Sequence, residues 1–394
     1  MVANIGIVWS LSTVSGWGVY GKNLAIQLMR RGRAVPILFA PTENLYLTPV
    51  ENRLLAAVLE GQRLTAEFMA SHAEEQVVCD FPVLHQLGDD LAGNPWQDRV
   101  RGGPNLGVVF FENTAFTDNG RERARRFEAV IAGSTWNAQV LREHTGATVA
   151  VCLQGIDPAV FHPAPRAGLM AGRFVVFSGG KLEYRKGQDI VIAAFRAFHA
   201  RHPDALLVTA WQSYDPLSAM HMIRAGLVKG IPAPRPNRLL DLDRWMVDNG
   251  LAPESFLNLD PLHNLLMAGI IREADVAVFP NRCEGGTNLV AMECMACGVP
   301  VILSANTGHL DILRKGACTV LRDQRPVTPL WPGHGVDGWG ESPVDEVLAA
   351  LEEAYADPAA ATRRGEAGAA MMRDWTWERQ VGRLMAEVSR HRSA

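Results

Sequence analysis

The sequence has no long apolar run and no excess of positive charge. No apolar stretch reaches about 18 residues without a charge, the length that a membrane-spanning helix requires, so we expect no such helix. The 38 Lys and Arg residues are outnumbered by 42 Asp and Glu residues, which gives a formal net charge of −4. This balance excludes a broad basic field of the kind that binds nucleic acid non-specifically.

The sequence also lacks the usual signs of export. Residues 1–4 place no basic group ahead of the first short apolar run, so they do not resemble a signal peptide. The six Cys residues are irregularly spaced, which is typical of reduced thiols in a cytoplasmic protein. Cys294 and Cys297 match a C-x-x-C motif by letters alone, and we interpret them as structural thiols because no second pair lies nearby. We therefore expect a cytoplasmic protein.

The first half of the chain alternates short apolar runs with amphipathic stretches. Its 394 residues suit two domains of roughly 150–200 residues each. Residues 5–9 and 34–39 read as strands, and residues 22–31 have the apolar spacing of a helix between them. Such a βαβ unit forms a parallel sheet. Further strands are predicted at residues 107–111, 129–132 and 149–153. A first Rossmann-like domain therefore spans residues 1–160.

The same pattern restarts after a passage rich in Pro, Ala and Gly. Residues 161–172 read as an interdomain linker. A second Rossmann-like domain over residues 173–376 opens with a strand at 173–178 and a helix at 187–200. Its further strands are predicted at residues 205–210, 256–259, 276–279 and 299–303. The fold class is thus α/β, with two Rossmann-like domains facing a central cleft. The last helix, within residues 377–394, is expected to pack back on the first domain.

Two short glycine-containing segments of the second domain indicate its chemistry. In the first segment, Gly179 and Gly180 end a strand and allow backbone N–H groups to approach a bound group closely. Lys181 and Lys186 add positive charge beside the start of a helix, where an anion is already favoured. The segment therefore suggests a pyrophosphate site, although its spacing is not that of a P-loop. A glycine turn with two solvated lysines is the alternative.

The second segment follows a strand that ends at Pro280 and leads into a helix. Thr287 or Asn288 is the candidate N-cap, so that N–H groups of the first helical turn face the cleft. Glu284 precedes this turn, near the expected position of a sugar. Glu293 lies about one turn inside the helix in an apolar stretch, where a carboxylate can bind a ribose diol. A surface charge is the alternative interpretation of Glu293.

Together the two segments resemble the second domain of glycosyltransferase family 4, the retaining nucleotide-sugar transferases of the GT-B fold. Residues 293–301, Glu-Cys-Met-Ala-Cys-Gly-Val-Pro-Val, are similar to the family's Glu-Ala-Met-Ala-x-Gly-x-Pro-Val element. Residues 155–157, Gly-Ile-Asp, resemble the family's domain junction, and residues 377–379, Trp-Glu-Arg, resemble its closing helix. Gly16 and Gly18 are similar to the N-terminal glycine loop, which implies that they close over the donor.

The chain departs from the family pattern in three places. Lys181 stands where the family usually has an Arg in its phosphate clamp, so a point charge replaces a planar fork. Glu284 and Glu293 are nine positions apart, one more than is usual. Glu112, after a strand of the first domain, stands where many relatives have a His that touches the donor sugar and some have a Glu. His85 is a further cleft candidate, with a buried structural histidine as the equal alternative.

The resemblance implies retaining transfer of a sugar from a nucleoside diphosphate sugar, such as a UDP or GDP sugar, to an acceptor hydroxyl. It implies no metal and no other cofactor, and the one Asp-x-Asp spacing, Asp241 to Asp243, lies in a polar stretch away from a strand end. Lysines and helix N-termini would hold the leaving diphosphate, which would itself take the acceptor proton. The residues implied in catalysis are Glu284, Lys186, Lys181 and Glu112. The residues implied in substrate binding are Gly16, Gly18, His85, Gly179, Gly180, Gly285, Gly286, Thr287, Asn288 and Glu293.

Other functions and partners stay open at this point. A catalytically degenerate sugar-nucleotide-binding protein would keep the site without turnover, and an inverting GT-B transferase would use Glu112 or His85 as its base. The acceptor is a glycan, a lipid or a protein, and no nucleic-acid partner is expected. The four arginines within residues 121–126 fit either a solvated helix face or contact with the inner face of a membrane. Trp211, Gln212 and Tyr214 either stack on the base or pack in the core.

Overall fold

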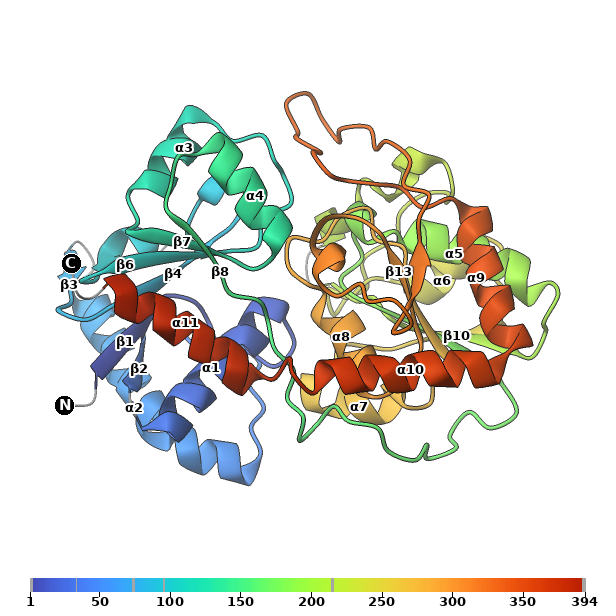
Figure 1. The fold of residues 1–394 in the computed structure, drawn as a ribbon, viewed down its shortest axis with the longest axis horizontal. Coiled ribbons are helices and arrows are strands. Elements are labelled where there is room, and N and C mark those ends of the chain that lie inside the picture. Colours follow the sequence, from blue (N-terminus) through green and yellow to red (C-terminus); the bar gives the residue numbers. More distant parts are fainter. Residues whose placement is uncertain (1–2, 33, 73–74, 95, 214–215, 392–394) are drawn as a thin grey trace. The chain divides into compact units, whose positions relative to one another are not determined.

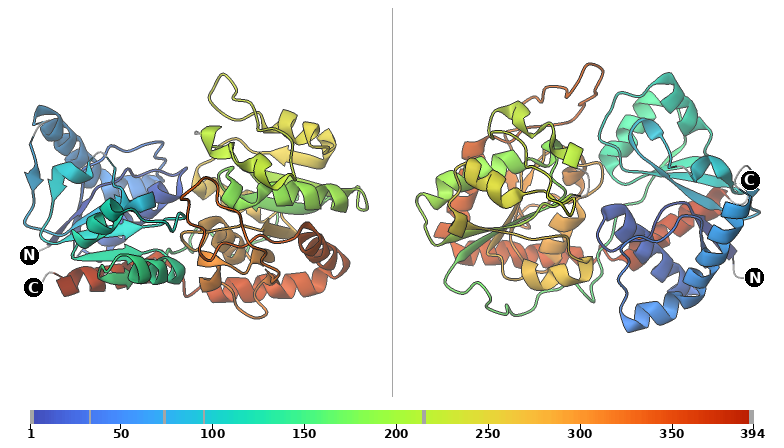
Figure 2. Two further views of the ribbon diagram at one scale, coloured as in Figure 1. Left: turned by 90° about the horizontal axis from the view of Figure 1, so that it is seen from above. Right: turned by 180° about the vertical axis from the view of Figure 1, so that it is seen from behind.

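The computed structural model describes residues 3–32, 34–72, 75–94, 96–213 and 216–391. The chain forms two compact units, residues 1–155 with 375–394 and residues 156–374 (Figure 1). Each unit has a parallel sheet of six strands with helices packed against it (Figure 2). The described residues contain no helix that is both long enough and apolar enough to cross a membrane.

The first unit is built on a sheet in the order β2-β1-β4-β6-β7-β8, and every neighbouring pair is parallel. Its strands are β1 (Ala3–Ile7), β2 (Ala34–Leu38), β4 (Val83–Leu87), β6 (Asn105–Val109), β7 (Ala129–Ala132) and β8 (Val149–Val151). The short strands β3 (Val77–Val78) and β5 (Val100–Arg101) pair separately. Its helices are α1 (Gly16–Arg31), α2 (Pro49–Ser71), α3 (Asp118–Arg125), α4 (Thr135–His144) and α11 (Trp377–His391). In order of appearance, the strands of the large sheet follow the 2-1-3-4-5 pattern of flavodoxin-like folds, extended by one strand.

The C-terminal helix α11 packs within the first unit, as the sequence predicts. An Nη atom of Arg31 donates to the Glu378 carbonyl at 2.5 Å. The rings of Tyr20 and Trp377 lie 5.5 Å apart between centroids. Gly155 is required at this contact, because a Cβ there would lie 2.5 Å from the Trp377 nitrogen. The chain therefore enters the second unit and returns to the first at neighbouring points.

The second unit has a sheet in the order β11-β10-β9-β12-β13-β14, and all its pairs are parallel. Its strands are β9 (Phe174–Gly179), β10 (Ala205–Ala210), β11 (Phe256–Asn258), β12 (Val276–Phe279), β13 (Val301–Ser304) and β14 (Thr319–Leu321). Its helices are α5 (Gln188–His199), α6 (Leu242–Asp248), α7 (Asn264–Ile271), α8 (Leu289–Ala296), α9 (Val344–Ala356) and α10 (Pro358–Met372). This is the Rossmann order 3-2-1-4-5-6, whose direction reverses between β9 and β12. Ligands of such sheets bind at the carboxyl ends of the strands beside that reversal.

Some predicted boundaries differ from the structure. Residues 156–172 belong to the second unit, whereas the first domain was predicted to end at residue 160 and a linker to follow at 161–172. The guanidinium of Arg166 explains this placement, because it contacts Asp275 at 2.8 Å and the carbonyls of Glu273 and Ala274. Helix α1 begins at Gly16 and not at residue 22, since the Ser15 side chain caps it by accepting from the Gly18 N–H.

Candidate functional site

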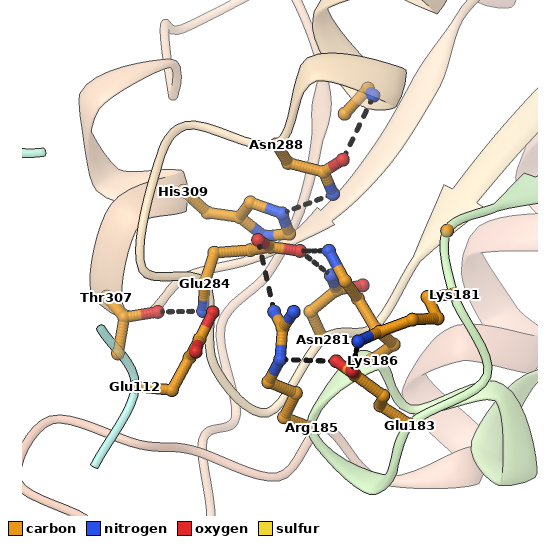
Figure 3. Close-up of polar contacts among 12 residues, drawn as sticks. Glu112, Lys181, Glu183, Arg185, Lys186, Asn281, Glu284, Asn288, Thr307 and His309 are labelled. Atoms are coloured by element: carbon orange, nitrogen blue, oxygen red, sulfur yellow. Dashed lines mark hydrogen bonds and ion pairs between the residues drawn. The ribbon is translucent and has the colours of Figure 1, made fainter. Parts of the chain in front are cut away.

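The two segments singled out in the sequence meet at the carboxyl edge of the second sheet, at the reversal of strand order. Gly179 ends β9, and the chain after β12 runs through residues 280–288 into α8. Between them lies a cluster of charged side chains (Figure 3). The structure thus brings together Lys181, Lys186 and Glu284, as predicted from their positions after strands.

The turn after β9 requires glycine and is held by Gln188. A Cβ on Gly179 would lie 2.7 Å from a methyl carbon of Val290, and Gly180 has φ of 120°, a conformation that other residues rarely adopt. The Gln188 amide donates to the carbonyls of Gly180 and Lys181 at 3.2 and 3.0 Å. The Gly180 N–H already donates to the Ala210 carbonyl at 3.0 Å. Gly180 therefore shapes the turn, and the expectation that its own N–H faces a ligand is wrong.

Three cationic and two anionic side chains form the charged cluster. The Glu284 carboxylate contacts the Lys186 ammonium, and it lies 3.5 Å from an Arg185 Nη. The Glu183 carboxylate lies 2.7 Å from Arg185 Nε and 2.5 Å from Lys181 Nζ. The five groups leave one net positive charge. Lys181 is about half exposed, whereas the Glu284 side chain is 5% exposed, so the cluster has one buried side and one open side.

Both carboxylates of the cluster are held in the ionised form. Burial alone would raise the pKa of Glu284, but Lys186 and Arg185 outweigh it and lower that pKa below its usual value. The same balance lowers the pKa of Glu183, where burial is opposed by Arg185, Lys181 and Lys186. The Asn281 amide also donates to Glu284, on the same oxygen as Lys186. The two ionised carboxylates therefore hold the cations of the cluster in position.

The start of α8 is fixed by a side-chain cap and a close backbone contact. Asn288, with φ of 61°, is the N-cap, since its side-chain oxygen accepts from the Ala291 N–H at 3.3 Å. Thr287 is not the cap, because its hydroxyl donates to the Met292 sulfur at 3.0 Å. The first N–H groups of α8 have no acceptor inside the helix and carry the positive end of its dipole. Gly308 must be glycine, because a Cβ there would lie 1.7 Å from the Gly286 oxygen.

His309 fixes the orientation of the cap. Its Nδ1 lies 3.2 Å from the Ser304 carbonyl oxygen, which can only accept, so Nδ1 carries the proton. The bare Nε2 then accepts from the Asn288 amide at 3.0 Å. Burial lowers the pKa of His309 to about 4, partly opposed by Glu284. His309 is therefore a neutral imidazole at neutral pH and positions Asn288.

Glu293 is buried in α8 and has a different environment from Glu284. It is 4% exposed, and its Oε1 accepts from the Asn264 amide at 2.6 Å. Burial raises the pKa of Glu293 to about 8, because the Asn264 hydrogen bond only partly offsets the loss of solvation. The carboxyl group is therefore largely protonated at neutral pH. The alternative of a solvated surface charge is excluded.

The predicted site residues of the first unit follow the carboxyl ends of its strands, with the exception of His85. Gly16 and Gly18 are in the first turn of α1 and not in a loop, and a Cβ on Gly18 would overlap Ser12. Glu112 follows β6, and its backbone N–H donates to Asp89 Oδ1 at 3.1 Å. His85 was expected after a strand end, but β4 continues through it to Leu87. Its ring is 2% exposed within the unit, so its placement at a strand end is wrong.

The sequence interpretation missed part of the cluster. Arg185 and Glu183 belong to it but were not predicted, and neither were Asn281 and Thr307, which contact Glu284, or His309, which contacts Asn288. For Arg185 the signal was its place beside Lys186, and for His309 it was a polar turn directly after β13. Trp211 is fully buried and its indole N–H donates to Ser178 at 3.1 Å, so it packs in the core. Tyr214 lies outside the described residues.

Comparisons with known proteins find similarity to glycosyltransferases. A family model described as family 4 glycosyltransferase in conflict systems matches residues 266–384, which include α8 and Glu284. A D-inositol 3-phosphate glycosyltransferase of Arthrobacter sp. (strain FB24) is 27% identical over 260 residues, 64% of this chain and 52% of that protein. One of the same name from Geodermatophilus obscurus is 28% identical over 293 residues, 67% of this chain and 60% of that protein. These matches support a glycosyltransferase similar to family 4. The chain matches between half and three-fifths of the length of these relatives.

Solved structures show that the chain has the GT-B fold. Sucrose-phosphate synthase from Thermosynechococcus elongatus superposes with a TM-score of 0.66 at 17% identity, covering 98% of both chains. Anabaena Alr3699/HepE in complex with UDP and glucose superposes with a TM-score of 0.63 at 16% identity, covering 98% of this chain and 99% of that one. Arg185 places a guanidinium 2.7 Å from Glu183, in the same cluster as Lys181.

Proposed function

We propose that the chain transfers a sugar from a nucleoside diphosphate sugar to an acceptor hydroxyl, with retention of anomeric configuration and without a metal ion. The observation that carries the proposal is the cationic cluster at the reversal of strand order in the second sheet. Lys181, Arg185 and Lys186 lie there beside the N-terminus of α8. A diphosphate suits this site because it offers several anionic oxygens to the three cations and is part of a nucleotide.

In this proposal the cations and the α8 N-terminus stabilise the leaving diphosphate. As the bond from the anomeric carbon to the β-phosphate oxygen breaks, negative charge grows on that oxygen. Lys186 and Arg185 are already held in place by Glu284 and Glu183, so little reorganisation is required at that moment. Gly285, Gly286 and Thr287 directly precede the Asn288 cap of α8 and are proposed to add backbone donors. The N–H groups of the first turn of α8 then act as additional donors.

Glu284 is proposed to contact the donor sugar. It is ionised and its side chain is 5% exposed, so the sugar would meet it at the buried side of the cluster. The acceptor hydroxyl would lose its proton to the leaving phosphate on the same face of the sugar as the breaking bond. The new bond from the acceptor oxygen to the anomeric carbon then forms on the face that the leaving group vacates. This arrangement retains configuration and requires no side-chain base.

Glu293 is proposed to bind the ribose of the nucleotide. A protonated carboxyl group has one donor and at least one acceptor, and it can satisfy both hydroxyls of a ribose diol. The Asn264 amide holds its Oε1 and thereby fixes the rotamer. Structural neighbours were solved with UDP and with UDP-glucose, so uridine diphosphate sugars are the first donors to test.

The test is donor turnover with defined stereochemistry. Release of the nucleoside diphosphate is measured for a panel of UDP, GDP, ADP and dTDP sugars, and the anomeric configuration of the product is read by NMR. Lys186→Met is expected to lower kcat by roughly 10²–10³-fold, because one charged donor to the leaving group is lost. Lys315→Met, an exposed lysine of the same unit, is the matched control and should leave the rate unchanged. Product of inverted configuration would contradict the retaining mechanism. Binding of a nucleotide without turnover of any donor would favour a sugar-nucleotide-binding protein.

A further inference from the structure

Helix α2 has apolar side chains on two faces, and one of these faces is open to solvent (Figure 1). The helix packs on α1 and β2 through its few buried residues. On the other face Val50 is 78% exposed, Leu64 is 52% exposed and Phe68 is 48% exposed. Apolar side chains that gather on an exposed face commonly mark an interaction surface.

The exposed face has the spacing of a coiled-coil seam. Its members follow one another at alternating steps of four and three residues and are Val50, Leu54, Ala57, Gly61, Leu64 and Phe68. This spacing is typical of a helix that packs along its length on a second helix. Ala57 is exposed, and Leu54 and Gly61 are partly exposed, so the seam is accessible from end to end. We call these residues the α2 seam.

Gly61 has no role within the chain that explains it. It lies inside a helix of 23 residues, where glycine is less favourable than alanine. A Cβ at this position would meet no atom within 4 Å, so nothing in the described chain requires its absence. A glycine near the middle of a seam allows the backbone of a second helix to approach closely, because the distance between packed helices depends on the side chains at the contact. Gly61 therefore suits a partner helix.

The α2 seam is complementary to itself when two copies run antiparallel. The facing residues are then symmetric about position 59, and the pairs are Val50 with Phe68, Leu54 with Leu64, and Ala57 with Gly61. The two small residues meet at the centre, and larger apolar residues meet on both sides of it. A two-fold dimer requires this kind of self-complementary surface, because each of its contacts is made twice.

The charges beside the seam are complementary in the same register. Arg53 is exposed near the start of α2, and Glu67, whose side chain is 62% exposed, lies near its end. Each directly precedes a seam residue, so the two lie on one flank and face each other across an antiparallel pair. Arg63 contacts both Glu60 and Glu67, and these three groups leave one net negative charge. One positive charge therefore faces one negative charge at each end.

We propose that two copies of this chain form a two-fold dimer through antiparallel α2 helices. Phe68 of each copy packs on Val50 of the other copy, and Arg53 of each copy pairs with Glu67 of the other. A parallel pair would instead bring like charges together at both ends. One helix from each copy is a small interface beside the roughly 1,200–2,000 Å² of stable complexes, so the dimer is weak and depends on concentration. This association does not depend on the proposed transfer reaction.

The test is sedimentation velocity of the full chain at concentrations from about 1 to 300 µM, which span a micromolar dissociation constant. The wild type is expected to pass from monomer to dimer across this range. Ala57→Glu places a charge in the seam and should weaken dimerisation at least about tenfold, because that charge would be buried without a partner. Ala56→Glu is the matched control, since Ala56 is the neighbouring exposed alanine outside the seam, and it should leave dimerisation unchanged.

Charge reversal tests the antiparallel register. Arg53→Glu and Glu67→Arg should each dimerise at least about tenfold more weakly alone, because each brings like charges together at both ends. A mixture of the two variants should form a heterodimer, because all facing charges are then opposite again, and this recovery also shows that both variants fold. A wild type that is monomeric throughout, a dimer that Ala57→Glu leaves intact, or a mixture without recovery would overturn the proposal. A monomeric wild type that binds phosphatidylglycerol vesicles, with binding lost in Ala57→Glu, would assign the seam to a lipid surface instead.

Discussion

Replacement of Arg282 by Met is expected to lower the free energy of unfolding by about 3–5 kcal/mol, because it leaves a buried carboxylate without its partner. Arg282 and Asp189 are both fully buried, and two Nη atoms of Arg282 lie 2.8 Å from the two oxygens of Asp189. Arg282 Nε contacts Glu341 at 2.6 Å, and the guanidinium lies 4.0 Å from the centre of the Tyr184 ring. The measurement is urea unfolding of wild type and variant followed by circular dichroism.

The double variant Arg282→Met with Asp189→Leu is the control for this prediction. Replacing both partners by apolar groups removes the unpaired charge, so most of the lost stability should return. The Arg282–Asp189 pair also lies next to the charged cluster, because the N–H groups of Arg282 and Cys283 donate to the Arg185 carbonyl at 2.7 and 3.1 Å. A loss below 1 kcal/mol in the single variant would show that the pair does not hold these segments together.

Replacement of Glu293 by Gln is expected to stabilise the protein at alkaline pH. Glutamine resembles the protonated acid, and its side-chain oxygen can keep the hydrogen bond from the Asn264 amide. The pKa of Glu293 is raised to about 8 by burial. Between its usual value and pH 8, the unfolded chain loses the proton while the native protein retains it. The contribution of Glu293 to the free energy of unfolding is therefore fully present below its usual pKa and is lost as the pH rises through 8.

The size of this effect follows from the same pKa. A shift of this magnitude corresponds to roughly 4–5 kcal/mol at pH values above 8. Thermal unfolding of wild type and Glu293→Gln should therefore differ little at pH 5 and by several kcal/mol at pH 8.5. Glu366→Gln, at an exposed position on α10, should show no such trend. A difference between Glu293→Gln and wild type that stays constant with pH would contradict the buried, protonated carboxyl group.

Strand positions could be predicted from the sequence better than helix boundaries. The apolar runs at residues 205–210 and 276–279 match β10 and β12, because strands buried on both faces are continuous apolar stretches. Helix α2 was missed, although Thr48 and Glu51 form a capping box before it. Only Leu55, Val58 and Met69 of its 23 residues are buried, so its apolar periodicity is weak.

The sequence predicted which segments form the site, but not which of their side chains contact one another. Glycines and lysines after β9 and the turn before α8 carry local signals, because their roles depend on neighbours in the chain. The contact between Arg185 and Glu284 spans 99 positions, and it depends on the sheet order that brings β9 next to β12. The tautomer of His309 likewise depends on the Ser304 carbonyl and Asn288, which only the folded chain brings together.

The most direct test of the central claim is the affinity of the protein for nucleoside diphosphates. Calorimetric titration with UDP, GDP, ADP and dTDP is carried out on wild type, Lys186→Met and the control Lys315→Met. We expect one diphosphate to bind the wild type and Lys315→Met with equal affinity. Lys186→Met should bind it at least tenfold more weakly, since one charge-assisted contact is lost. Equal binding by Lys186→Met and wild type would contradict a diphosphate site at the carboxyl ends of β9 and β12.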